Sequence, residues 1–253
     1  MITRDELRRI AQMNGVPLHT QEKDYIQNLF LFRLYLLEEA ENLVLKGGTC
    51  LKLFYGSNRF SEDLDFTLLK MIDIESLLSK AVSDLSLVGI KAEVNKEKYF
   101  IDGFTCRLKY RGPLYTGDKF SIGSIRIDIS FRGDVFLEPS WKLLTPPYPD
   151  IRPFFTLCMD VREIFAEKIR ALLIRAKPRD VYDVWFLLQR KVELDKEILL
   201  RKLEVVSREP KFQLIEIDEE TMRRDLRLLL PQPINYRQIL EEVNNYLSRI
   251  LTG

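Results

Sequence analysis

The first part of the chain alternates between two kinds of hydrophobic spacing. Apolar residues three or four positions apart are typical of helices, and apolar residues two positions apart are typical of strands. Helical spacing covers residues 3–14, 20–41, 49–55 and 74–87. Strand-like runs cover residues 43–45, 63–69, 90–94, 104–111 and 124–131. This mixture predicts an α/β (α+β) fold in which helices pack against a mixed sheet.

Helical spacing continues almost without interruption through the second part of the chain. Between the two parts, residues 143–153 contain several prolines, which favour a boundary there. Beyond this segment the spacing predicts helices over residues 161–175, 178–189, 195–207, 219–229 and 236–251. We therefore expect an N-terminal domain over residues 1–145 and a C-terminal helical bundle over residues 146–253.

The composition is that of a soluble globular chain. Hydrophobic residues make up 46% of the 253 residues, charged residues make up 30%, and the net charge is +1. All apolar runs fall short of the roughly 18 residues that span a bilayer, and the first residues lack the apolar core of a signal peptide. The expectation is a cytoplasmic protein with no membrane contact. A net charge near zero neither requires nor excludes a nucleic-acid partner.

Histidine and cysteine are too scarce for several kinds of catalytic site. His19 is the single histidine, whereas Ser-His-Asp and Cys-His catalysis need a positioned imidazole and His-rich metal sites need several. The three cysteines, Cys50, Cys106 and Cys158, have no paired spacing, so neither a disulfide framework nor a zinc site is expected. Catalysis in this chain must therefore rest on carboxylates, lysines, hydroxyls and metal ions.

A glycine pair occupies the turn between a predicted strand and a predicted helix. Gly47 and Gly48 let the backbone come close to a ligand, and the helix N-terminus that follows offers free N–H groups to a phosphate. Thr49 adds a hydroxyl at this turn, and Lys46 adds a positive charge. A glycine pair alone is a weak signal, because most such pairs are ordinary turns.

Two aspartates follow on the next predicted strand. Asp63 and Asp65 are two positions apart, so their side chains share one face of that strand. Adjacent carboxylates repel each other unless a cation lies between them, and Mg²⁺ (or Mn²⁺) takes oxygen ligands and shares them with phosphates. Asp128 lies within a β-branched strand, where an aspartate is unfavourable without a partner. If it shares the face of the other two, the three carboxylates could hold two metal ions.

The glycine pair and the first two aspartates belong to a longer motif. It consists of Lys46-Gly47-Gly48-Thr49-Cys50-Leu51, Tyr55-Gly56 and Arg59-Phe60-Ser61-Glu62-Asp63-Leu64-Asp65-Phe66. This motif resembles the signature of the AbiEii/AbiGii nucleotidyltransferase toxin family, whose members share the DNA polymerase beta-type nucleotidyltransferase fold. The C-terminal motif of that family is similar to Ala166-Glu167-Lys168-Ile169-Arg170-Ala171 and Arg179-Asp180-Val181-Tyr182-Asp183. The resemblance covers about residues 20–188.

The resemblance implies roles for the residues of the first motif. The positions that hold the triphosphate correspond in this chain to Gly47, Gly48 and Thr49. Asp63 and Asp65 correspond to the metal positions. Many nucleotidyltransferases have Gly-Ser where this chain has Gly-Thr, and the hydroxyl is kept. The resemblance supports Asp128 less strongly, because some members of the family use no third strand carboxylate.

The second motif implies a lysine at the nucleotide. Lys168 corresponds to the family lysine proposed to contact it, where an ammonium would stabilise developing phosphoryl charge. Asp180 and Asp183 are three positions apart on a predicted helix, so they share a face, and either could orient the lysine. We expect Asp180 to help bind the nucleotide and Asp183 to take part in catalysis, although the choice between them stays open. The alternative for these residues is a salt-bridged helix pair without a catalytic role.

The function implied by the resemblance is metal-dependent transfer of a nucleoside monophosphate from a nucleoside triphosphate to an acceptor hydroxyl, with release of pyrophosphate. The expected acceptor is RNA, at the 3′ end of tRNA, and the expected biological role is that of a toxin with a cognate antitoxin protein. The alternatives are transfer to a small-molecule or protein hydroxyl, and a catalytically silent nucleotide-binding module. Arg107, Lys109 and Arg111 alternate along a predicted strand and could guide nucleic acid, although such groups are more often simply solvated.

Overall fold

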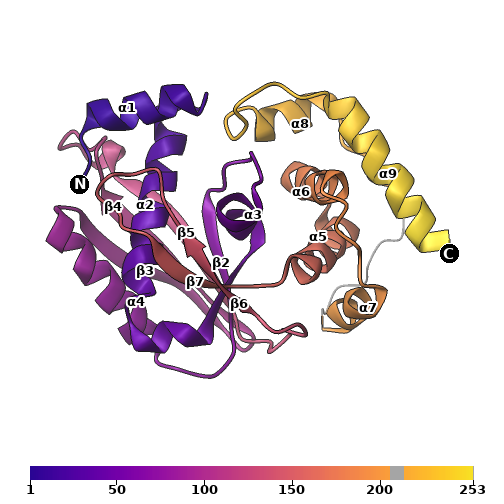
Figure 1. Ribbon diagram of the computed structural model, residues 1–253, viewed down its shortest axis with the longest axis horizontal. Coiled ribbons are helices and arrows are strands. Elements are labelled where there is room, and N and C mark those ends of the chain that lie inside the picture. The colour runs from indigo at the N-terminus through magenta and orange to yellow at the C-terminus, as the bar shows by residue number, and fades with distance from the viewer. Residues whose placement is uncertain (206–213, 253) are drawn as a thin grey trace.

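The computed structural model describes residues 1–205 and 214–252. Within them, seven strands form one mixed sheet in the order β3-β4-β5-β2-β1-β7-β6 (Figure 1). The strands are β1 (Leu43–Lys46), β2 (Asp63–Leu68), β3 (Lys91–Phe100), β4 (Gly103–Arg111), β5 (Gly123–Ser130), β6 (Ser140–Leu144) and β7 (Phe154–Cys158). The pairs β2–β5 and β1–β7 are parallel, and the other neighbouring strands are antiparallel. The predicted mixed α/β fold is confirmed.

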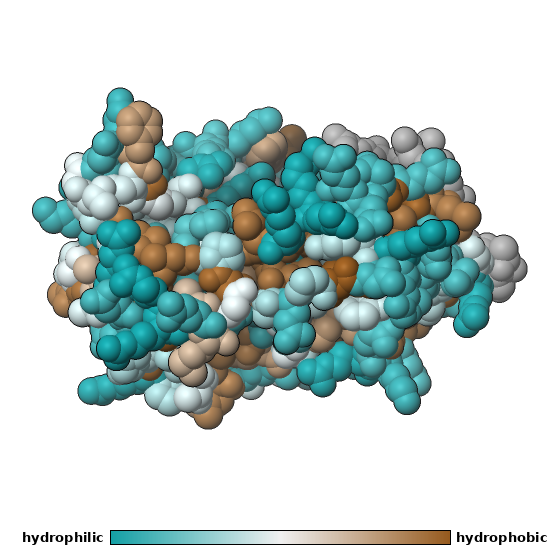
Figure 2. All heavy atoms as spheres, turned by 90° about the horizontal axis from the view of Figure 1, so that it is seen from above, coloured by the Kyte–Doolittle hydropathy of each residue, from teal (hydrophilic) through white to brown (hydrophobic). Residues whose placement is uncertain are grey.

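Helices lie at both sides of this sheet. They are α1 (Arg4–Met13), α2 (Leu18–Leu34), α3 (Gly47–Tyr55), α4 (Ile74–Ser83), α5 (Val161–Arg175), α6 (Pro178–Gln189), α7 (Lys196–Glu204), α8 (Glu219–Leu226) and α9 (Tyr236–Thr252). Figure 1 shows α1, α2 and α4 at one side of the molecule and α5 to α9 at the other, with α3 between them. The face seen from above in Figure 2 is mainly hydrophilic, with apolar residues scattered among charged ones. In the described part of the chain, no helix combines the length and the apolar character that a membrane crossing requires.

The long helix predicted over residues 20–41 ends earlier in the structure, at Leu34. Tyr35 comes directly after it, and its hydroxyl donates to the carbonyl oxygens of Leu43 and Leu157 at 2.7 and 3.3 Å. These contacts with β1 and β7 turn the chain toward the sheet, and a short 3-10 helix then leads into β1. Tertiary contacts therefore override the helical spacing of the last predicted turns.

Two strands, β6 and β7, are absent from the elements that hydrophobic spacing predicts. They pair with each other, with Trp141 opposite Leu157, and β7 joins the sheet beside β1, where Cys158 lies opposite Leu45. The proline-rich segment 143–153 thus connects two paired strands of the sheet. A short apolar run such as β7 cannot be distinguished from part of a helix by its spacing alone, because both patterns fit a few residues.

The sheet therefore extends past the predicted domain boundary. A division between residues 145 and 146 would separate β6 from its partner β7. We propose instead that the helical part begins where α5 begins, at Val161, directly after the last strand. The helices predicted for this part correspond to α5 to α9, except that the end of the one predicted over 195–207 lies outside the described residues.

Candidate active site

Two of the three carboxylates predicted for metal binding, Asp63 and Asp65, lie on β2, in the middle of the sheet. Phe66 of this strand is fully buried in the core, so Asp63 and Asp65, at the alternate positions, face the opposite side. In the sheet register, Asp65 lies opposite Lys46 of β1 on one side and opposite Asp128 of β5 on the other. Strand pairing therefore brings together charged residues from three separate segments of the chain.

The glycine turn before α3 lies against Asp65. Gly47 has a φ of 71°, in the left-handed region that glycine adopts without steric cost. A Cβ atom at this position would overlap the Asp65 carboxylate, so only glycine lets the carboxylate lie against the backbone. The turn predicted to hold a triphosphate and the carboxylate predicted to hold a metal are thus adjacent.

Asp63 and Asp65 are partly buried and have no hydrogen-bond or ion-pair partner among the described residues. Burial, together with the charges of Asp63 and Asp128, raises the pKa of Asp65 to about 6 against the opposing charge of Lys168. Burial also raises the pKa of Asp63. A divalent cation bound between the two carboxylates would offset their mutual repulsion, because it carries the opposite charge and prefers oxygen ligands.

Asp128 is engaged differently from the other two aspartates. Its carboxylate accepts a hydrogen bond from the Thr105 hydroxyl at 2.6 Å and forms an ion pair with Arg126 at 2.9 Å. Over residues 1–205 and 214–252, no three acidic, histidine or cysteine side chains are grouped so that they could hold one metal ion. Asp128 lies opposite Asp65 and lines the same hollow as Asp63 and Asp65, but its carboxylate is already engaged, so the two carboxylates without a partner are those of Asp63 and Asp65.

Lys168 of α5 is held by the two aspartates of α6. Its Nζ atom lies 2.8 Å from Asp183 Oδ2 and 3.4 Å from Asp180 Oδ1. Asp180 also accepts two hydrogen bonds from Arg175, at 2.9 and 3.1 Å. Burial lowers the pKa of Lys168, but the two carboxylates outweigh burial and raise it, so the ammonium stays charged. Both aspartates that the sequence leaves as alternatives contact the lysine.

Arg59 is a residue of this site that was not among the predicted site residues. Its guanidinium donates to both oxygens of Asp183, at 2.8 and 2.9 Å, and its side chain is only 3% exposed. A Cβ atom at Gly48 would overlap this guanidinium, so the second glycine of the turn makes room for Arg59 rather than for a ligand alone. The signal in the sequence is that Arg59 belongs to the same motif as Gly48 and Asp63, although spacing alone does not show what it binds.

The hydroxyl of Thr49 is used within the chain. It donates to the backbone carbonyl of Asp63 at 2.5 Å, and the Thr49 side chain is fully buried. This hydrogen bond joins the first turn of α3 to the start of β2. The residue therefore fixes the glycine turn relative to the carboxylates, whereas the resemblance had implied a contact with the triphosphate.

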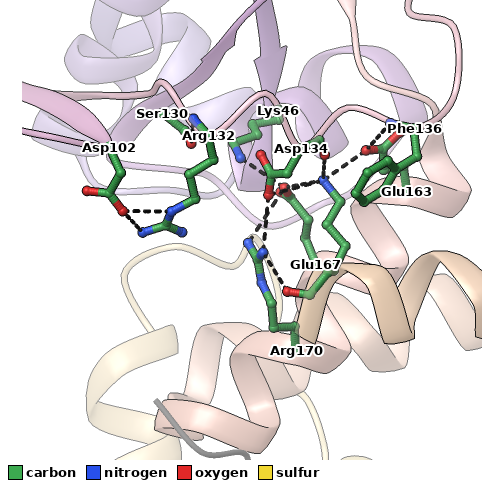
Figure 3. Close-up of polar contacts among 10 residues, drawn as sticks. Lys46, Asp102, Ser130, Arg132, Asp134, Phe136, Glu163, Glu167 and Arg170 are labelled. Carbon is green, nitrogen blue, oxygen red and sulfur yellow. Dashed lines mark hydrogen bonds and ion pairs between the residues drawn. The ribbon is translucent and has the colours of Figure 1, made fainter. Parts of the chain in front are cut away.

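Lys46 belongs to a second group of buried charges beside the first. Its Nζ atom lies 2.9 Å from Glu167 Oε1 (Figure 3). The same oxygen lies 3.0 Å from Nζ of Lys202, and Lys202 also contacts Glu163 at 2.8 Å. We call the residues Lys46, Glu163, Glu167, Lys202, Asp134 and Arg170 the α5–α7 ion network.

This network neutralises its own charges. Arg170 and Asp134 lie 3.2 Å apart, which ties α5 to the segment after β5 (Figure 3). Burial by itself would raise the pKa of Glu167. The surrounding cations, above all Lys46, outweigh burial and hold this pKa far below its usual value. Lys202 is fully buried, yet its position on a predicted helix gives no sign of this, because a lysine in an amphipathic pattern is normally solvated.

Three hollows meet at Asp65, which is the residue that lines all of them. The first, of about 380 Å³, is bordered by the glycine turn and by Lys168 and Arg170 of α5. The second, of about 460 Å³, lies between β2 and the helices α6 and α8. The third, of about 340 Å³, lies at the tip of the β3–β4 hairpin, beside Phe100 and Arg132.

Comparison with known proteins identifies the family. The family model described as the nucleotidyl transferase AbiEii toxin of a type IV toxin–antitoxin system matches residues 29–251. The structure of MenT4, the nucleotidyltransferase toxin Rv2826c of Mycobacterium tuberculosis, is similar with a TM-score of 0.70 and 19% identity, over 100% of this chain and 90% of that one. The structure of JHP933 from Helicobacter pylori is similar with a TM-score of 0.60 and 20% identity, over 93% of each chain. No curated protein sequence matches the chain.

At these identities the two structures show that the fold is shared, and the family model, which covers most of the chain, shows the family. The family predicted from the two sequence motifs is therefore confirmed. This chain belongs to the AbiEii nucleotidyltransferase toxin family of type IV toxin–antitoxin systems.

Proposed function

We propose that this nucleotidyltransferase is metal-dependent and transfers a nucleoside monophosphate from a nucleoside triphosphate to an RNA hydroxyl, at the 3′ end of tRNA. The observation that carries the catalytic part is the pair Asp63 and Asp65, which are partly buried, have raised pKa values, have no hydrogen-bond or ion-pair partner in the described chain and lie beside the glycine turn. The family supports the role as a toxin, and with it a cognate antitoxin protein as partner and a cytoplasmic site of action.

The metal chemistry follows from this donor set. Mg²⁺ or Mn²⁺ held by Asp63 and Asp65 would supply positive charge at the α-phosphate and lower the pKa of the acceptor hydroxyl. Gly47, which lies against Asp65, would present its backbone to the triphosphate. Lys46 lines the hollow beside this turn and adds positive charge there.

The remaining work falls to side chains that are already held in place. In the transfer, the acceptor oxygen bonds to the α-phosphorus, the bond to the pyrophosphate oxygen breaks, and the hydroxyl proton leaves to water. Lys168 lines the same hollow as Asp65 and is kept charged by Asp183, so it can stabilise the negative charge that develops on the phosphoryl oxygens. Arg59 contacts Asp183 and acts as a positioning residue for Lys168.

An RNA acceptor is supported by the basic residues next to the carboxylates. The Thr105 hydroxyl of β4 reaches Asp128 of β5, which shows that Arg107 and Lys109, at alternate positions from Thr105, share the face of the carboxylates. Arg126 lies on the same face of β5, two residues before Asp128. Cations on this face suit the phosphates of a nucleic acid, whose neutralisation makes binding dependent on salt.

A transfer assay with nucleoside triphosphates labelled at the α-phosphate tests the proposal. Each triphosphate is incubated with the full chain and with separate pools of tRNA, protein and small molecules. We expect label on tRNA, loss of labelling with a chelator, and loss in the variant that combines Asp63→Asn with Asp65→Asn. Label on protein or a small molecule but never on RNA would instead favour the second candidate acceptors. A cellular effect that survives in the double variant would favour the silent nucleotide-binding module.

A further inference from the structure

We propose that the third hollow, at the tip of the β3–β4 hairpin, is the binding site for the nucleoside of the donor triphosphate, with the base stacked on Phe100. This inference rests on the proposed function. In nucleotidyl transfer, three groups extend from the α-phosphorus: the departing pyrophosphate, the nucleoside and the acceptor. Three hollows extend from Asp65 in the structure, and their linings differ in a way that assigns one group to each.

The first hollow suits the pyrophosphate because its lining has the largest excess of basic over acidic residues. It has five basic and two acidic residues, the second hollow has seven and five, and the third has three and three. Lys46, Lys168 and Arg170 all line it. Each is held by carboxylates of the chain, at 2.9 Å for Lys46, 2.8 Å for Lys168 and 3.2 Å for Arg170, so the cations are positioned before a ligand arrives. Preorganised cations beside the glycine turn favour the leaving group that carries the most negative charge.

The second hollow suits the acceptor because it is the largest of the three and has Asp63 in its wall. It lies between the sheet and the helices α6 and α8, and Lys177 and Arg224 are among the residues that line it. The phosphates at the end of an RNA would need cations of this kind. Assigning these two hollows leaves the third for the nucleoside.

Phe100 gives the third hollow an aromatic surface. The residue is 39% exposed, and Nζ of Lys98 lies over its ring, 4.4 Å from the centroid. The neighbouring Tyr99 instead packs its ring against Phe104 and Phe131, at 5.5 and 5.8 Å, which anchors the hairpin tip. No other aromatic ring stacks on Phe100 among the residues that the structure describes, so part of the ring is free to receive a nucleobase. Bases of every type stack on such rings, since each has a π-face.

The remaining walls of the third hollow keep it open and polar. Gly103 lies opposite Phe100 in the sheet register, and a Cβ atom there would come within 2.9 Å of the Ile129 carbonyl oxygen, so no side chain can fill this side. Arg132 is held at the rim by an ion pair with Asp102 at 2.6 Å (Figure 3). An aromatic surface with a fixed donor beside it and a volume of about 340 Å³ matches what small-molecule sites offer, namely apolar contact plus a few polar groups.

The hairpin also supplies a matched control. Ile101 is the next residue after Phe100, its side chain is fully exposed (104%), and it does not line the hollow. Truncation of either residue therefore perturbs the same hairpin tip, but only Phe100→Ala removes a surface of the hollow. Phe100→Trp keeps an aromatic ring and adds a fluorescent one.

The experiment measures the binding of nucleoside triphosphates and of inorganic tripolyphosphate to the full chain with Mg²⁺, together with the KM values for both substrates of the transfer. For Phe100→Ala we expect at least about tenfold weaker binding of the triphosphates and a KM that rises equally, because base stacking is lost. Tripolyphosphate binding and the KM for the acceptor should not change. Ile101→Ala should behave as the wild type, and the triphosphates should quench the added fluorescence of Phe100→Trp more than tripolyphosphate does.

Three results would overturn the inference while leaving the proposed function intact. In the first, Phe100→Ala binds the triphosphates as Ile101→Ala does. In the second, Phe100→Ala loses as much affinity for tripolyphosphate as for the nucleoside triphosphates. In the third, Phe100→Ala raises the KM for the acceptor and not that for the triphosphate. If the wild-type chain binds no triphosphate and transfers no label, the proposed function itself is wrong and the inference falls with it.

Discussion

Two groups of charged residues, one buried and one partly buried, lie side by side in this protein, and they differ in how their charge is compensated. In the α5–α7 ion network, Glu167 is shared between Lys46 and Lys202, so every charge has an opposite charge within the chain. Asp63 and Asp65, one strand away, have no such partner in the described residues. Lys46 joins the two groups, because its backbone pairs with Asp65 and its side chain binds Glu167.

The difference suggests different roles. The charges of the α5–α7 ion network hold parts of the fold together, whereas Asp63 and Asp65 lack a counter-ion that a ligand could supply. A buried ion pair contributes little net stability, but removing one partner leaves the other uncompensated and costs a great deal. A partly buried carboxylate pair without a counter-ion lowers the stability of the free protein, and a bound cation would compensate its charge. The raised pKa of Asp65 and the lowered pKa of Glu167 express this contrast in opposite directions.

The largest effect is expected for loss of the uncompensated group. Asp65→Asn should lower the rate of nucleotidyl transfer by about a thousandfold or more, because a carboxylate that holds the metal is replaced by a neutral amide. Initial rates with saturating triphosphate and Mg²⁺ measure this change, and circular dichroism checks the fold. If Asp65→Asn kept an activity within a few fold of the wild type, the uncompensated carboxylate would not be needed for catalysis.

The compensated group should instead affect stability. Lys202→Met should lower the free energy of unfolding by about 3–5 kcal/mol, because Glu163 and Glu167 lose their buried counter-ion. Urea unfolding measures the change. Lys80→Met, which breaks the exposed pair with Glu39, is the matched control and should have little effect. Similar stabilities for the two variants would show that the network does not hold the fold.

The pH dependence of stability should distinguish Asp65 from an ordinary carboxylate. Because folding raises its pKa from 3.8 to about 6, the charge of Asp65 destabilises the folded state increasingly as the pH rises from about 4 to 6, and fully above that range. In the presence of a chelator, Asp65→Asn should therefore be more stable than the wild type by about 2 kcal/mol at pH 8, and the difference should disappear below pH 4. Thermal or urea unfolding across this pH range measures it. A variant less stable than the wild type at pH 8 would contradict the desolvation of this group.

The smallest effect is expected for a residue that connects the site to the helices. Arg59→Lys keeps the charge but loses the two parallel hydrogen bonds to Asp183, so Lys168 is held less firmly. The rate constant kcat should fall by about tenfold with little change in KM, because positioning rather than binding is affected. Arg223→Lys, in an exposed pair on α8, is the control. A change in KM alone would assign Arg59 to substrate binding.

Much of the candidate site follows from local sequence. The alternation of Asp63 and Asp65 with buried neighbours, and the glycine turn before α3, depend on periods of two residues and on steric freedom at glycine, which act over a few residues. The same is true of Asp180 and Asp183, which share a helix face and both reach Lys168. The family motifs combine these local patterns, which is why the family could be predicted from the residues.

Other features depend on contacts between distant segments. The spacing of residues 35–41 is helical, but Tyr35 binds the carbonyl groups of two strands and ends the helix early. The short strand β7 is stabilised by its position beside β1, not by its own pattern. The sequence indicates that Asp128 needs a partner, yet only packing shows that Thr105 and Arg126 provide it.

By itself, therefore, the sequence determined the residue types, their faces and the family of this protein, because those depend on local periodicity and on motifs. Only the tertiary structure decided which charges are compensated, since a counter-ion such as Lys202 lies more than thirty residues from Glu167 along the chain. The tertiary structure also decided that the hollows meet at Asp65. Strand order and helix packing determine which distant segments become neighbours, and the sequence pattern does not indicate this.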